Sequence, residues 1–88
     1  MPILHHNRVE VRDAKGRRSG HVVVYVNDEW NTVSFLAKGN VFGRARQDAS
    51  SWVLDLPRVT LECSSLSETI TLGVAEGKRI CLRPIGAR

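Results

Sequence analysis

The sequence predicts a small antiparallel all-β domain of about six to eight strands, a partly open barrel or a sandwich, with room for one short helix. Apolar and polar residues alternate with a period of two in short runs, as in strands that bury one face. Turn residues separate these runs at intervals of roughly 10–12 residues, as in small barrels and sandwiches. Residues 21–26 are apolar on both faces and β-branched, which predicts a strand covered on both sides.

The first half of the chain is expected to form hairpins. Residues 8–12 alternate without error, and residues 13–16 follow with Asp first and Gly fourth, as in a type I turn. Residues 32–35 alternate again, and Gly39-Asn40 suits a two-residue hairpin loop. The return strand is then expected at residues 41–46.

The second half is expected to continue the sheet. Residues 52–56 place three apolar side chains on one face, and Pro57 marks a bend or an edge because proline cannot donate to a sheet ladder. Residues 59–63 form the cleanest alternating run. Residues 69–74 alternate as well, and residues 79–83 are expected to close the sheet.

Three segments also fit helices. Residues 28–39 offer an N-cap at Asn27 or Asp28 and a C-cap at Gly39, although their β-branched residues favour a strand. Residues 46–51 have room for one helical turn. Residues 65–68, Ser-Leu-Ser-Glu, match a capping box, but the Thr-Ile-Thr-Leu run that follows favours a strand.

The length of 88 residues predicts one compact β-domain spanning residues 1–88. No apolar run reaches the roughly 18 residues that span a bilayer, and residues 1–6 show no long apolar region and no cleavage-site pattern, so we expect no secretion signal. We therefore expect a cytoplasmic protein with no membrane partner. A domain this small has a thin core, which favours a homodimer.

Two cysteines, Cys63 and Cys81, allow at most one disulfide. If both lie on strands, their alternation with neighbouring residues points the two thiols to different faces. We therefore expect two free thiols, with Cys63 buried, as is usual in a reducing compartment.

The charge of the chain is uneven. The formal net charge is +4, and all of it lies in residues 1–46, because residues 47–88 carry equal numbers of acidic and basic residues. Ten of the thirteen cations are arginines, whose planar fork suits phosphate and carboxylate. A G+C-rich coding sequence would also enrich arginine, so the arginine content fits either a surface that binds anions or a coding bias.

Motifs for catalysis or metal binding are not recognisable. The potential metal ligands His5, His6, His21, Cys63 and Cys81 lack the paired spacing of zinc sites. The serines stand in no nucleophile elbow, and residues 39–44 lack the Lys-Ser/Thr of a phosphate loop. We expect no metal, no cofactor and no catalytic residue.

A nucleic-acid interface has more support. Small β-domains hold single strands with a basic groove and aromatic platforms. The candidate cations crowd two turns and one strand, and alternation along that strand places Phe42 on the same face as Arg44 and Arg46. Two aromatic residues are not easily explained as core, so the candidate residues are Arg12, Lys15, Arg17, Arg18, Lys38, Arg44, Arg46, Trp30 and Phe42.

The sequence therefore supports three hypotheses. The first is a non-enzymatic module that binds nucleic acid, or acts as a regulator, through the basic N-terminal half. The second is a protein-interaction or self-assembling module that uses exposed sheet edges and binds no nucleic acid, its cations being a solvated hairpin. The third is a small-ligand binder or an enzyme with no recognisable motif.

Overall fold

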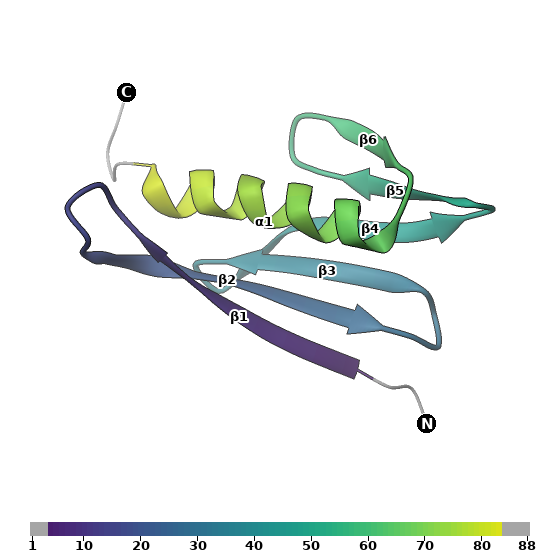
Figure 1. The fold of residues 1–88 in the computed structure, drawn as a ribbon, viewed down its shortest axis with the longest axis horizontal. Helices are drawn as coiled ribbons and strands as arrows, with labels where there is room; N and C mark the ends of the chain where they lie inside the picture. Colours follow the sequence, from purple (N-terminus) through teal and green to yellow (C-terminus); the bar gives the residue numbers. More distant parts are fainter. Residues whose placement is uncertain (1–3, 84–88) are drawn as a thin grey trace.

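The computed structural model describes residues 4–83, and the side chains of residues 7–83, as one antiparallel sheet and one helix (Figure 1). The elements are β1 (Leu4–Arg12), β2 (Arg18–Asn27), β3 (Thr32–Ala37), β4 (Asn40–Asp48), β5 (Ser51–Asp55), β6 (Thr60–Cys63) and α1 (Leu66–Leu82). Each strand pairs with the next along the chain, in the order β1 to β6. This meander confirms the small antiparallel domain, and its six strands form one open sheet with α1 along one face.

Alternation along the strands decides which side chains face α1. In β2, Val22, Val24 and Val26 are buried under the helix, whereas Val23 and Tyr25 point to the opposite face and are half-buried. The apolar pattern of this strand predicted cover on both sides. That prediction is wrong for the described residues, because α1 covers only one face of the sheet.

The helix α1 replaces two of the expected strands, over residues 69–74 and 79–83. Its N-terminus is a capping box: the backbone N–H of Glu68 donates to Ser65 Oγ at 3.1 Å, and the Glu68 carboxylate accepts from the backbone N–H of Ser64 at 3.0 Å. The hydroxyl of Thr69 donates to the carbonyl of Ser65, four residues earlier. These local bonds satisfy the first turn, so the β-like composition of the segment does not prevent a helix.

The other two ambiguous segments are not helical. Residues 28–39 contain a turn followed by β3, so the strand alternative is confirmed there. Residues 46–51 lie at the ends of β4 and β5 and in the tight turn between them. In that turn Ala49 has φ 57°, in the left-handed region that tight turns require.

Two β-bulges aim extra side chains at α1. The β1–β2 register shifts once and leaves Ser19 without a partner, and the β3–β4 register shifts once and leaves Phe42 without one. The Ser19 hydroxyl donates to the Cys81 carbonyl of α1 at 3.0 Å. The ring of Phe42 lies 6.0 Å from that of Phe35, between centroids, and packs into the core below α1. Both irregularities therefore serve helix packing.

Two glycines allow α1 to lie unusually close to the sheet. The buried stripe of the helix consists of Thr69, Gly73, Gly77 and Cys81, spaced four residues apart. A Cβ at Gly73 would overlap the ring of Phe35, and a Cβ at Gly77 would lie 2.7 Å from a Val22 methyl carbon. Because no side chain fits at either position, the backbone of α1 at Gly73 and Gly77 directly contacts side chains of the sheet.

The two cysteines are free and both are buried. Cys63 belongs to the larger core cluster, with Phe35 and Leu54, and Cys81 belongs to the smaller one, with Val11 and Val22. The expectation of free thiols, with Cys63 buried, is confirmed. The reason given for it, that both cysteines lie on strands and point to different faces, is wrong. Cys81 lies on α1 and faces the core.

Within residues 4–83, no helix combines the length and the apolar character needed to cross a bilayer.

The close contact at Gly73 leads to a test. Replacing Gly by Ala inside a helix ordinarily stabilises it by roughly 1 kcal/mol. Here we expect Gly73→Ala to lower the free energy of unfolding by about 1–3 kcal/mol, because the added methyl overpacks against Phe35. Urea unfolding measures this, with Lys78→Ala on the exposed side of α1 as the control. An unchanged or raised stability for Gly73→Ala would contradict the packing described.

Candidate nucleic-acid interface

The face of the sheet opposite α1, hereafter the open face, is not covered by any described segment. The strand register places its side chains in rows. One row crosses the sheet through Tyr25, Ser34, Arg44 and Asp55, each opposite the next. The neighbouring row runs through Asn27, Thr32, Arg46, Val53 and Glu62. The open face thus combines cations, hydroxyls and half-buried apolar groups.

Three of the predicted cations are held by carboxylates of the first hairpin. Arg12 and Arg18 both contact the Glu10 carboxylate, at 2.8 and 2.9 Å, and Arg17 lies 3.6 Å from Asp13. Arg12 also donates to the carbonyl of Gly16, at 2.7 Å. These exposed pairs contribute little to stability, but they partly neutralise the cations that the sequence grouped together.

The remaining predicted cations form no ion pair among the described residues. Lys15 lies in the β1–β2 turn, Lys38 in the β3–β4 turn, and Arg44 and Arg46 on β4. Alternate turns of a meander return to one end of the sheet, so the turns with Lys15 and Lys38 lie at the same end. Arg44 and Arg46 are exposed and two residues apart, which puts both on the open face at a spacing of roughly 7 Å.

A shallow hollow of about 410 Å³ lies between the two arginines and β5. Its lining includes Thr32, Ser34, Arg44, Arg46 and Val53, and on the β5 side also the acidic residue Asp55. Guanidinium groups bind phosphate and stack on flat rings, and hydroxyls donate and accept hydrogen bonds. The hollow therefore offers the contacts that an unstacked base and its phosphate require.

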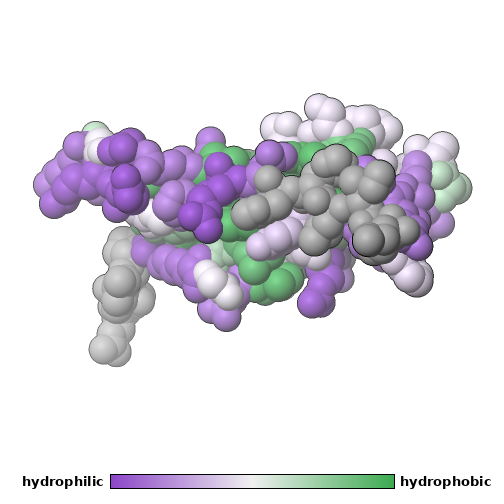
Figure 2. All heavy atoms as spheres, turned by 90° about the horizontal axis from the view of Figure 1, so that it is seen from below, coloured by the Kyte–Doolittle hydropathy of each residue, from purple (hydrophilic) through white to green (hydrophobic). Residues whose placement is uncertain are grey.

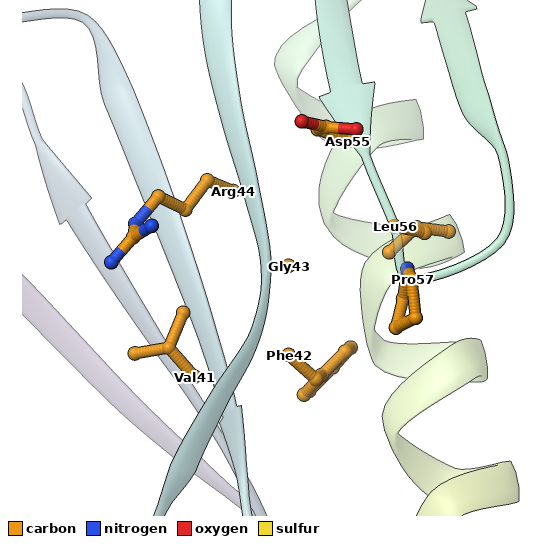
Figure 3. Close-up of a pocket in the computed structure, with 7 residues that line it drawn as sticks. All are labelled: Val41, Phe42, Gly43, Arg44, Asp55, Leu56 and Pro57. Carbon is orange, nitrogen blue, oxygen red and sulfur yellow. The ribbon is translucent and has the colours of Figure 1, made fainter.

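Acidic residues limit this surface on one side. Asp55 stands opposite Arg44 on β5, where its carboxylate accepts a hydrogen bond from the Thr60 hydroxyl at 2.9 Å, and Glu62 follows on β6. Figure 3 shows the Arg44 guanidinium extending away from Asp55. The open face is therefore basic over β4 and acidic over β5 and β6.

Phe42 does not lie with the arginines. Alternation predicted one face for Phe42, Arg44 and Arg46, but the bulge turns Phe42 to the α1 side, so that prediction is wrong. Figure 3 shows Phe42 on the opposite side of the β4 ribbon from Val41 and Arg44. Its ring is half-buried and lines a second hollow of about 210 Å³, whose other lining residues include Leu56, Pro57, Arg44 and Asp55. Phe42 is therefore a packing residue in this fold.

Trp30 lies in the β2–β3 turn and is 69% exposed. The side chain of Asn27 accepts hydrogen bonds from the backbone N–H groups of Glu29 and Trp30, each at 3.1 Å. This turn lies at the end of the sheet opposite Lys38 and contacts β4 next to Arg46, where the Gln47 N–H donates to the Asn31 carbonyl. Trp30 therefore stands apart from the basic turns and closer to Arg46.

The hydroxyls and the apolar residues that line the hollow of the open face were not predicted from the sequence. Thr32, Ser34 and Val53 line the hollow, and Tyr25 lies in the row of Ser34 and Arg44. The alternation of β3 already indicated that Thr32 and Ser34 share the face opposite Phe35. Strand register, which the sequence did not supply, was needed to place them beside the arginines.

The comparisons place no known protein beside this chain: no family model, no curated protein and no solved structure matches it. Among the described side chains, no three His, Cys, Asp or Glu residues gather where they could hold a metal ion. His5 and His6 lie outside the described side chains.

The two aromatic candidates are expected to respond differently to truncation. Phe42→Ala should lower the free energy of unfolding by up to about 3 kcal/mol, because it removes a ring packed against Phe35 and the helix. Trp30→Ala, on an exposed turn, should change it by less than about 0.5 kcal/mol. Chemical denaturation of both variants measures the difference. Equal effects would show that the assignment of Phe42 to the core is wrong.

Proposed function

We propose that this protein binds single-stranded nucleic acid on the open face of its sheet, without catalysing a reaction. The observation that carries the proposal is the pair of exposed guanidinium groups of Arg44 and Arg46, which lack an ion-pair partner among the described residues. Beside them lies a hollow that is lined with hydroxyls and Val53 and is bounded on the β5 side by Asp55. A row of cations along a β-strand, next to a surface that bases can contact, suits a flexible single-stranded nucleic acid better than a rigid duplex.

The chemistry of the pair favours phosphate over a carboxylate partner of the same chain. Arginine contacts phosphate through two parallel N–H donors, and its plane also stacks on a base. Thr32 and Ser34 are close enough to line the same hollow and offer donors and acceptors to base edges. Val53 supplies an apolar contact for a ring.

Lys38 and Lys15 extend the attraction toward one end of the sheet. They carry full charges without a described ion pair, whereas Arg12, Arg17 and Arg18 share two carboxylates. The proposal therefore assigns the direct contacts to Arg44, Arg46 and Lys38. The cations of the first hairpin contribute a more distant field, which salt screens beyond about 8–10 Å.

The proposal is tested by binding of fluorescent single-stranded homopolymers of thymidine and uridine at several salt concentrations. Three phosphate contacts predict a slope of log K against log salt of roughly −2, because each contact with a single strand contributes about −0.7. We expect Arg44→Ala/Arg46→Ala to weaken binding strongly and to bring the slope to about −0.7. The stability of this variant should stay unchanged, because exposed cations contribute little.

Arg17→Ala is the matched control, since it removes one exposed arginine of the same basic half that is already beside Asp13. It should weaken binding by less than either Arg44→Ala or Arg46→Ala. The proposal fails if the wild-type protein binds neither homopolymer at low salt. It also fails if Arg17→Ala weakens binding as much as the β4 variants do.

A further inference from the structure

The outer edge of β1 is a long stretch of backbone without a described partner. β1 runs over nine residues, from Leu4 to Arg12, and pairs on one side only, with β2. The opposite edge of the sheet is β6, which has four residues. A long edge strand presents unpaired N–H and C=O groups, which favours the addition of a further strand.

Proline, lysine and bulges, which commonly protect an edge strand, are missing from the middle of β1, whose charges are Arg8 and Glu10. Residues 7–11 contain no proline and no lysine, and their pairing with β2 is regular, because the register shift falls beyond Val11. Proteins ordinarily blunt such edges with proline, inward-pointing charges or bulges. This stretch is therefore suited to pairing with another strand.

The side chains of β1 are self-complementary about Val9. Arg8 and Glu10 flank Val9 and both face the open side of the sheet, opposite Val23 and His21 of β2. We infer that β1 pairs antiparallel with β1 of a second copy of the chain, with Val9 opposite Val9 of the partner subunit. In this register Arg8 of each copy stands opposite Glu10 of the partner subunit, whose carboxylate also contacts Arg12 and Arg18 of its own chain, so the pairing brings a third cation to each Glu10.

Neighbouring registers are unfavourable. Moving the two-fold axis to Glu10 sets two glutamates directly opposite each other, and moving it to Arg8 does the same with two arginines. A slip by one residue sends every side chain of one strand to the wrong face. The charge pattern therefore selects the Val9-centred register. Arg8, which forms no ion pair within the described chain, gains one in it.

Apolar surface supports the same contact. Val9 faces the α1 side, is half-buried and packs against the cluster of Val11, Val22 and Cys81. Figure 2 views the molecule from the side of β1, where apolar atoms are visible among hydrophilic ones. Pairing about Val9 sets the two Val9 side chains opposite each other, so each valine buries more of its side chain.

The geometry of the pair has a defined result. A two-fold axis perpendicular to the sheet joins two six-stranded sheets into one continuous sheet. Both helices then lie on one side and both open faces on the other. This inference does not depend on nucleic-acid binding, because it uses the edge of β1 and none of the residues of the hollow.

The first experiment exchanges the charges. Alone, Arg8→Glu places glutamate opposite Glu10 of the partner subunit, and Glu10→Arg places arginine opposite the partner's Arg8, so each should weaken self-association by about tenfold or more. An equimolar mixture of the two variants restores both pairs and should associate as a heterodimer. Analytical ultracentrifugation of the wild type, of each variant and of the mixture measures this.

The mixture also controls for misfolding, because two damaged chains would not recover by mixing. Far-ultraviolet circular dichroism should show both variants to be folded. A wild-type protein that stays monomeric up to millimolar concentration overturns the inference. So does a mixture that associates no better than its components, or single variants that remain as dimeric as the wild type.

The second experiment tests the register by disulfide trapping. Opposite residues of an antiparallel pair have Cα atoms about 4.5–5.5 Å apart, within the range that a disulfide bridges. Val9→Cys should therefore form a covalent dimer under mild oxidation. Asn7→Cys is the matched control, since residues 7 of the two copies would lie roughly 13 Å apart in this register. Equal trapping of both variants, or trapping of Asn7→Cys alone, excludes the Val9-centred pairing.

Discussion

The contact between the two glycines of α1 and the sheet is the constraint on which the rest of the structure depends. Gly73 lies on the ring of Phe35, and Gly77 lies on Val22 and Phe42, at distances that leave no space for a Cβ. This contact decides which face of the sheet is covered. It therefore also decides that Arg44 and Arg46, on the other face, remain exposed. The buried core and the candidate interface are two consequences of one packing contact.

The bulge at Phe42 makes that arrangement compatible with the sequence of β4. In a regular strand Phe42 would share a face with Arg44, and either the ring would be exposed or the guanidinium would be buried. The register shift turns Phe42 toward α1 and leaves Val41 and Arg44 on the open face. Burying an unpaired guanidinium would cost several kcal/mol, so one unpaired backbone position is a small cost by comparison. The bulge thus allows Phe42 to be buried while Arg44, two residues later, stays exposed to solvent.

The sequence predicted the sheet better than the helix, for a physical reason. The strands were recognisable because one buried face imposes strict alternation, as in residues 8–12 and 59–63. α1 was not, because its buried stripe consists of small residues, including Gly73 and Gly77, and small residues give a weak helical pattern. The cations of the candidate interface were found from charge alone. Charge alone did not show that Arg12 and Arg18 contact Glu10 whereas Arg44 and Arg46 have no described ion pair. Only the strand register of the structure shows this, and only the register shows that Phe42 turns toward α1.

The glycines of α1 also bear on how the chain folds. Each glycine inside a helix costs roughly 1 kcal/mol relative to alanine, and an isolated helix of this length is marginal even with good helix formers. α1 has 17 residues and contains two glycines and two threonines, so it has little tendency to form before the sheet exists. The meander, in contrast, is built from hairpins between neighbours in the sequence, which close short loops. We therefore expect the hairpins to assemble first and the C-terminal helix to pack last onto the sheet they form.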